Sequence, residues 1–254
     1  MEREEWLRAY ADAWERADAS VADLFTDDAT YRSHVFRAPR TGRDGIRAYW
    51  EDATATQRDA RVRIGEALVD GTRVVAEWWT TMAEEEGPVT LPGVLLLDFE
   101  GDRCRELREY WALEPGRHDP FVEWGRFEPG ERAREHAERW AERYAAAWRA
   151  GDPDAAAALY SEDVVYRSHT FREPHRGRAG VREYSAQAYA AESGRDVWIG
   201  VAAAAGASAA VEYRTKFLTE DTWRTLAGCA LLSFDDGGLV TSSREYWHLE
   251  EGVL

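Results

Sequence analysis

The sequence predicts an α+β protein built of two tandem domains, and three observations support this. First, the stretch 31–49 returns at 166–184, with twelve of nineteen positions identical and each pair 135 positions apart (166 minus 31). Second, within each half apolar residues recur first at helical spacing and then in alternation. Third, turn signals such as Asp70-Gly71 separate the alternating segments, which is typical of antiparallel hairpins. Helices followed by an antiparallel sheet indicate an α+β domain.

The chain of 254 residues is long enough for two ordinary domains, each with its own core. We predict a first domain at 1–114, a linker at 115–130 and a second domain at 131–254. Pro-Gly pairs mark both ends of the linker, but aromatic residues lie within it. We therefore expect it to pack on the surface of a domain rather than to move freely.

The first half begins with an aromatic helix face, because Trp6, Tyr10 and Trp14 recur at intervals of four. The period then changes from 3.6 to 2. The expected elements are helices at 5–17, 19–25 and 43–57 and strands at 29–36, 61–64, 72–82, 89–99 and 103–113.

The strand at 29–36 contains the repeated Tyr-Arg-Ser-His sequence. Strict alternation places Tyr31 and Ser33 on one face and Arg32 and His34 on the other. A bulge would turn His34 toward the opposite face. The second half follows the same plan, with a helix at 133–150 and the repeated strand at 163–171.

Composition excludes several classes of protein. The net charge is −16, from 32 basic and 48 acidic residues, which disfavours binding to nucleic acid and to anionic membranes. No apolar run reaches the roughly 18–20 residues of a membrane span, and no signal sequence follows the charged N-terminus. We expect a cytoplasmic protein without metal or other cofactor, since neither zinc spacing nor a phosphate-binding loop is present.

Each half resembles a SnoaL-like domain of the nuclear transport factor 2 superfamily. The resemblance rests on Arg143–Asp152, on Leu159–Tyr166, on the Gly-x-x-Gly run Gly177–Tyr184 and on the closing Glu245-Tyr246-Trp247. It implies two cone-shaped domains, each a curved antiparallel sheet wrapped around about three N-terminal helices. It also implies that the chain is a monomer whose halves pack as an internal pseudodimer, with further self-association left open.

Ketosteroid isomerases of this superfamily suggest roles for individual residues. Tyr10 and Tyr144 match the tyrosine that donates to the oxyanion. The place of the general-base aspartate falls on Ser33 and Ser168, and a serine is no base at neutral pH. The second acid of that site is also replaced, by Leu95 and Ala230. Steroid isomerisation by that mechanism is therefore not expected.

His34 and His169 are the next candidates for proton transfer, because histidine titrates near neutrality. The alternative is that a neighbouring carboxylate satisfies them at the domain interface. Glu77 and Glu212 interrupt apolar strands at matching places. They are expected either to pair with the repeated arginines, Arg32 and Arg167, or to join the histidines in a polar cluster.

We predict an aromatic pocket for a small, largely apolar molecule. If the chain is an enzyme, the expected chemistry is cofactor-free acid–base catalysis by an isomerase, dehydratase, cyclase or hydrolase, with His34, His169, Tyr10 and Tyr144 as catalytic residues. The alternative is a non-catalytic binding or assembly module. The predicted ligand-binding residues are Trp14, Tyr31, Ser33, Phe36, Trp78, Tyr110, Trp148, Tyr166, Ser168, Phe171, Tyr213 and Tyr246.

Overall fold

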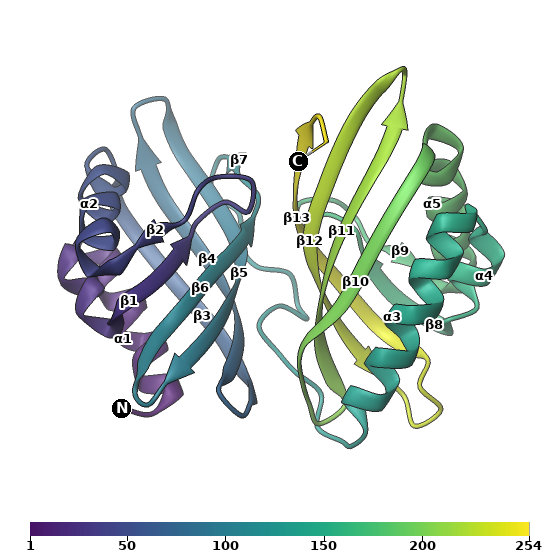
Figure 1. Cartoon of the computed structure of the whole chain (residues 1–254), viewed down its shortest axis with the longest axis horizontal. Coiled ribbons are helices and arrows are strands. Elements are labelled where there is room, and N and C mark those ends of the chain that lie inside the picture. The colour runs from purple at the N-terminus through teal and green to yellow at the C-terminus, as the bar shows by residue number, and fades with distance from the viewer. Residues whose placement is uncertain (254) are drawn as a thin grey trace. The chain divides into compact units, whose positions relative to one another are not determined.

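A computed structural model describes residues 1–253 and divides the chain into two compact units, Met1–Arg126 and Phe127–Leu254. Each unit is a twisted sheet with helices packed against one face (Figure 1). The helices are α1 (Arg3–Glu15), the 3₁₀ turn η1 (Ala19–Leu24) and α2 (Gly42–Thr54) in the first domain, and α3 (Ala133–Ala150), α4 (Pro153–Ala157) and α5 (Gly177–Ala191) in the second. The predicted α+β class and the three helices per domain are confirmed.

The two sheets have equivalent topologies. The first contains β1 (Phe25–Arg32), β2 (Arg40–Thr41), β3 (Arg58–Asp70), β4 (Arg73–Glu84), β5 (Gly87–Glu100), β6 (Arg103–Trp111) and β7 (Glu114–Pro115), in the order β2-β1-β6-β5-β4-β3 with β7 paired to β5. The second contains β8 (Tyr160–Arg167), β9 (His175–Arg176), β10 (Ser193–Ala205), β11 (Ser208–Thr219), β12 (Thr222–Phe234) and β13 (Val240–Glu251), in the order β10-β11-β12-β13-β8-β9.

One pair of strands in each sheet departs from the expected antiparallel pattern. β1 runs parallel to β6, and β8 runs parallel to β13. These strands are far apart in the chain, so a long connection permits parallel pairing that a hairpin would not. As a consequence, the repeated tyrosine of β1 and β8 lies beside the last long strand of its sheet.

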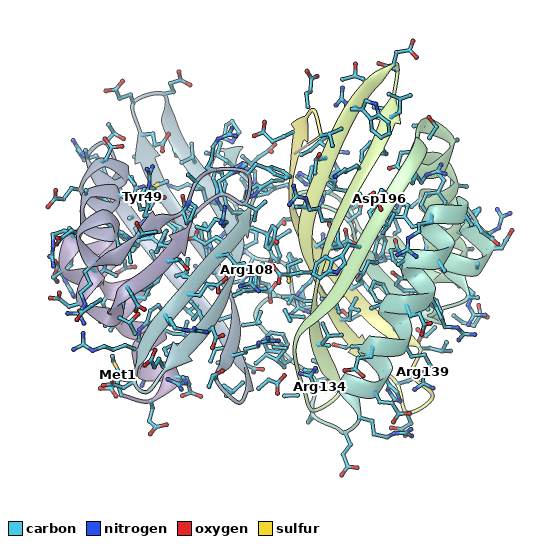
Figure 2. The ribbon with its side chains drawn as sticks, in the orientation of Figure 1. Met1, Tyr49, Arg108, Arg134, Arg139 and Asp196 are labelled. Carbon is cyan, nitrogen blue, oxygen red and sulfur yellow. The ribbon has the colours of Figure 1, made fainter. Side chains whose placement is uncertain are left out.

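The first helix of each domain has an aromatic face packed on its sheet. In α1, Trp6, Tyr10 and Trp14 are buried, and the indole N–H of Trp6 donates to the carbonyl of Leu24 at 2.9 Å. The opposite face of α3 carries charges that pair along the helix. Arg134 and Arg139, labelled in Figure 2, lie near Glu138 and Glu135 at i, i+4 spacing. Across residues 1–253, every helix is too short or too polar to span a bilayer.

The strand predicted at 29–36 ends earlier than expected. β1 stops at Arg32, and a turn follows in which the amide of Arg37 donates to the carbonyl of His34 at 3.0 Å. The guanidinium of Arg32 closes the same turn by donating to the carbonyl of Arg37 at 2.8 Å. Side-chain hydrogen bonds to the backbone thus replace further strand pairing. β8 likewise ends at Arg167, before the predicted limit at Phe171.

Each end of the segment that connects the sheets packs on the unit to which it belongs. The amide of Gly125 donates to the carboxylate of Glu77 at 2.8 Å, and Gly125 lies so close to Gly65 that a Cβ on Gly65 would come within 2.5 Å of it. Farther along, the amide of Glu128 donates to the hydroxyl of Ser208 at 2.8 Å. The buried Glu77 therefore holds the connecting segment to the first domain.

Candidate functional site

A carboxyl group on the last strand of the second domain is the centre of the candidate site. The hydroxyl of Tyr166 on β8 donates to Glu245 Oε1 at 2.7 Å, and the hydroxyl of Tyr213 on β11 donates to Oε2 at 2.9 Å. Each carboxyl oxygen thus has one phenolic donor. The parallel pairing of β8 with β13 places Tyr166 beside this strand, since Tyr166 aligns with Ser243.

A glycine allows Tyr213 to reach the carboxyl from two strands away. Tyr213 on β11 pairs with Gly228 on β12, which in turn pairs with Trp247 on β13. A Cβ on Gly228 would lie 2.5 Å from the hydroxyl oxygen of Tyr213. Any side chain at position 228 would therefore push the phenol off the sheet and away from Glu245.

The environment of Glu245 favours its neutral form. Burial raises the pKa of this carboxyl from 4.5 to about 7, and the hydrogen bonds from Tyr166 and Tyr213 oppose the rise. Burial also raises the pKa of both tyrosines well above 10, so they remain neutral donors. A carboxyl group with a pKa near neutrality can accept and return a proton at physiological pH.

Glu245 borders a cavity of about 180 Å³ in the second domain. An engineered cavity of roughly 150 Å³ is enough for benzene, so this one has room for a small organic molecule. Nine of the residues that line the cavity are aromatic: Trp140, Tyr144, Trp148, Tyr166, Tyr184, Tyr189, Tyr213, Phe217 and Trp247. Helices supply one wall and the sheet supplies the other, with Glu245 on the sheet.

Two further polar groups on α5 line this cavity. The side chains of Ser185 and Tyr189, one helical turn apart, are buried at its wall. Glu192, just after the helix, accepts from the indole of Trp148 at 3.0 Å and pairs with Arg195 at 3.2 Å. Burial still raises the pKa of Glu192.

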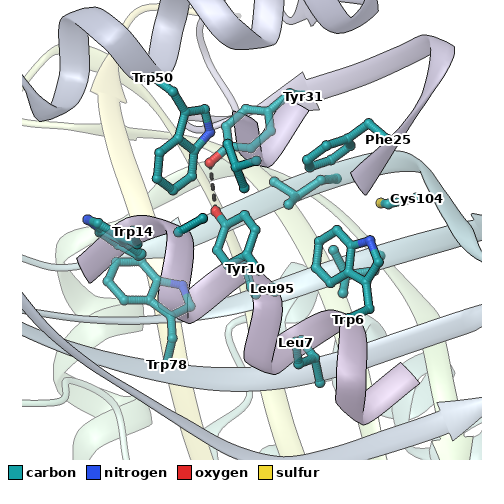
Figure 3. Close-up of a cluster of buried hydrophobic side chains, with 14 of the residues drawn as sticks. Trp6, Leu7, Tyr10, Trp14, Phe25, Tyr31, Trp50, Trp78, Leu95 and Cys104 are labelled. Atoms are coloured by element: carbon teal, nitrogen blue, oxygen red, sulfur yellow. Dashed lines mark hydrogen bonds between the residues drawn. The ribbon is translucent and has the colours of Figure 1, made fainter. Parts of the chain in front are cut away.

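The first domain repeats the carboxyl group but not the cavity. The hydroxyl of Tyr31 donates to Glu109 Oε1 at 2.5 Å, and the hydroxyls of Tyr10 and Tyr31 are 2.8 Å apart (Figure 3). Burial raises the pKa of Glu109 to about 7, as in the other domain. The cavity beside Glu109 is only about 40 Å³, which is room for about three water molecules.

Three exchanges of residues account for the smaller cavity. The second domain has Ser185, Ala230 and Tyr213 where the first has Trp50, Leu95 and Trp78 at the offset of 135. Trp50 fills the space, since its ring lies 5.4 Å from that of Tyr10 and 5.9 Å from that of Trp14. Figure 3 shows Trp50, Trp78 and Leu95 within this cluster. The exchange of Tyr213 for Trp78 also removes a donor to the carboxyl.

The structure separates the predicted site residues into two groups. Those that line a cavity are Tyr10, Trp14 and Tyr31 in the first domain and Tyr144, Trp148, Tyr166 and Tyr213 in the second. Those that lie elsewhere are His34, Ser33, Phe36, Trp78 and Tyr110 in the first domain and His169, Ser168, Phe171 and Tyr246 in the second. Trp78 belongs to the core, and Tyr110 and Tyr246 alternate with the two glutamates and so face the other side of their strands.

The repeated histidines lie in the turn after the strand, outside the cavity wall. His34 Nδ1 accepts from the amide of Phe36 at 3.3 Å, and His169 Nδ1 accepts from the amide of Phe171 at 3.3 Å. The ring of His169 packs against that of Trp247, with centroids 5.7 Å apart. These bonds hold the turn, and a catalytic role for the histidines stays a prediction.

Glu245 belongs to the closing Glu-Tyr-Trp motif of the sequence, but neither it nor its counterpart Glu109 was predicted to be a site residue. The signal was the closing strand, where Leu107, Glu109 and Trp111 share one face and Leu107 is fully buried. An acidic residue between two inward-facing apolar residues indicates a buried carboxyl. Tyr110 and Tyr246 were predicted to line the pocket instead, but they lie on the opposite face of the strand from the glutamates. Residues 1–253 contain no cluster of three or more His, Cys, Asp or Glu side chains suited to a metal ion.

Comparisons with known proteins agree with this architecture. The sequence profile of the SnoaL-like domain matches residues 7–107 and 141–242. The chain belongs to the SnoaL-like domain family. No curated protein matches the chain.

Solved structures that resemble this SnoaL-like protein each cover somewhat less than half of it. A hypothetical protein with a ketosteroid isomerase-like fold from Catenulispora acidiphila, solved in complex with trimethylamine, is 27% identical, with a TM-score of 0.39 over 42% of this chain and 84% of its own. An LEH-like epoxide hydrolase of M. tuberculosis is 23% identical, with a TM-score of 0.39 over 45% of this chain and 84% of its own. SalBIII, an epoxide hydrolase/cyclase-like enzyme of salinomycin pyran ring formation, is 19% identical, with a TM-score of 0.39 over 43% and 90%.

Proposed function

We propose that the second domain binds a small, largely apolar molecule in its aromatic cavity and moves a proton on it with Glu245. The observation that carries this proposal is a carboxyl group, held by two phenolic hydroxyls, at the wall of a cavity of about 180 Å³. A general base must lie within reach of the proton that it removes and have a pKa near the working pH. Glu245 lies at the wall of the cavity, and its pKa is about 7.

The reaction class that fits is cofactor-free acid–base catalysis, as in an isomerase, dehydratase or cyclase. Glu245 takes a proton from a bound carbon acid or hydroxyl and returns it at another atom. Tyr166 and Tyr213 keep the carboxyl oriented, and their hydrogen bonds become stronger when it is ionised. Tyr144 lines the same cavity and supplies a hydroxyl for developing negative charge on an oxygen.

Proton transfer can be tested before the natural substrate is identified. A panel of small cyclic ketones, such as 2-tetralone, is incubated with the protein in heavy water, and exchange of the α-hydrogens is followed by NMR. We expect accelerated exchange that rises with pH through about 7, where Glu245 ionises. Glu245→Gln should lower the rate by about 10²–10⁴-fold, the usual contribution of a general base.

Two controls separate this mechanism from its alternatives. Glu109→Gln changes the equivalent carboxyl beside the small cavity and should leave exchange unchanged. His169→Gln should also leave the rate within about twofold of the wild type, because His169 does not line the cavity. A large loss in His169→Gln with an active Glu245→Gln would assign the chemistry to the histidine. Ketone binding without exchange at any pH would indicate a non-catalytic binding module.

A further inference from the structure

We infer that the cavity of the second domain accepts a ligand carrying an alkylammonium group, with the cation seated among the aromatic rings beside Glu245. This inference rests on the proposed function, because it names the class of ligand for the same cavity. It follows from the charges that line the cavity, from its rings and from its size.

The lining has acidic groups but no basic ones. Among the described residues that border the cavity, Glu192 and Glu245 are the ionisable carboxyls, and none is lysine, arginine or histidine. Arg195 pairs with Glu192 at 3.2 Å and so offsets the charge of that carboxyl. An anionic ligand would meet repulsion here, whereas a cation would meet a carboxylate without a positive partner.

The groups that face Glu245 are neutral phenols from four elements. They are Tyr144 on α3, Tyr160 and Tyr166 on β8, Tyr184 on α5 and Tyr213 on β11. Their hydroxyls can stabilise the carboxylate by hydrogen bonding but cannot neutralise it. A bound cation would supply the missing charge, and it would therefore favour ionisation of Glu245.

The rings provide a surface that replaces the hydration of an ammonium group. Trp148 and Tyr213 meet at 5.9 Å between centroids, and Tyr166 and Tyr184 meet at 5.3 Å, so rings from helices and sheet converge on one space. Aromatic faces carry partial negative charge and bind alkylated ammonium groups, most strongly where water is excluded. The net charge of −16 would also favour the approach of cations.

A pair of isosteric probes tests the inference directly. Choline and 3,3-dimethylbutan-1-ol have the same shape, but only choline is charged. We expect isothermal titration calorimetry at pH 8.5 and low salt to show that choline binds about tenfold more tightly than the alcohol. At pH 6 the preference should shrink, because Glu245 is then mostly protonated, while binding of the alcohol should not change.

Variants identify the origin of the preference. Glu245→Gln keeps the size of the side chain and should lose most of the preference and all of its pH dependence. Glu109→Gln is the matched control and should behave as the wild type. Ser185→Trp fills the cavity and should abolish binding of both probes, which provides a second test should Glu245→Gln fold poorly.

The outcomes distinguish the two proposals. Equal affinities for choline and the alcohol at pH 8.5 would overturn the cation inference and leave the pocket and its proton chemistry intact. A preference for choline that survives in Glu245→Gln at full strength would also overturn the assigned site. Binding of neither probe would contradict the cation inference, while ketone exchange would still report on the proposed function.

Discussion

The two domains share a fold and a buried carboxyl but differ in the space beside it. Glu109 and Glu245 have the same raised pKa of about 7, yet their cavities are about 40 and 180 Å³. The first domain places the ring of Trp50 in this space, where the second has the small side chain of Ser185. Both copies of the duplicated domain therefore keep the buried carboxyl, while the space beside it is much smaller in the first copy.

The two carboxyls also differ in how far a ligand could reach them. Glu109 is 4% exposed and borders a cavity of only about 40 Å³, which is too small for an organic ligand of the size of benzene. Glu245 keeps more exposure because the larger cavity reaches it. The carboxyl is almost fully buried in the first domain and partly exposed in the second.

Removing the tryptophan that fills the first cavity is expected to have the largest effect on stability. Trp50→Ser should lower the free energy of unfolding of the first domain by about 3–5 kcal/mol, because it removes a buried ring and leaves a void. Denaturant unfolding followed by circular dichroism measures this loss. A ligand that binds the second domain should then bind a second equivalent, and a loss below 1 kcal/mol would mean that Trp50 does not fill the space.

The buried carboxyls should make stability fall as pH rises. The pKa of Glu109 is about 7 in the folded chain against an ordinary 4.5, so its stabilising contribution is complete below pH 4.5 and is lost as pH rises through 7. The shift corresponds to about 3 kcal/mol at most. Unfolding free energies measured between pH 5 and 8 should decline in the wild type and decline less in Glu109→Gln. An equal slope in both proteins would place the pH dependence elsewhere.

Filling the second cavity is the reciprocal change and should affect binding more than stability. Ser185→Trp introduces the residue of the first domain, and the affinity for any cavity ligand should fall by more than about tenfold, since the ring occupies the space. We expect the free energy of unfolding to change by about 1 kcal/mol or less in either direction, because new contacts offset repacking. Unchanged affinity in this variant would show that the ligand binds outside the cavity.

Much of the architecture followed from the sequence alone. The repeat at an offset of 135 established two equivalent domains, and the spacing of Trp6, Tyr10 and Trp14 placed the first helix with its buried face. These features are local or self-similar, so they can be read without knowing which strands pair. The packing of the two halves as an internal pseudodimer stays a prediction.

The site depended on tertiary structure, for two physical reasons. The sequence does not fix where a strand ends or which of two neighbouring residues faces inward. The turn at Ser33–Phe36 therefore places the histidines outside the predicted strand. On the last strand, Glu245 faces inward and Tyr246 does not. The volume of the cavity is the space that the helices and the sheet enclose, less the space that the side chains fill. Ser185 and Ala230 are far apart in the chain, and they affect the cavity volume only because the fold brings them to opposite walls of the same cavity.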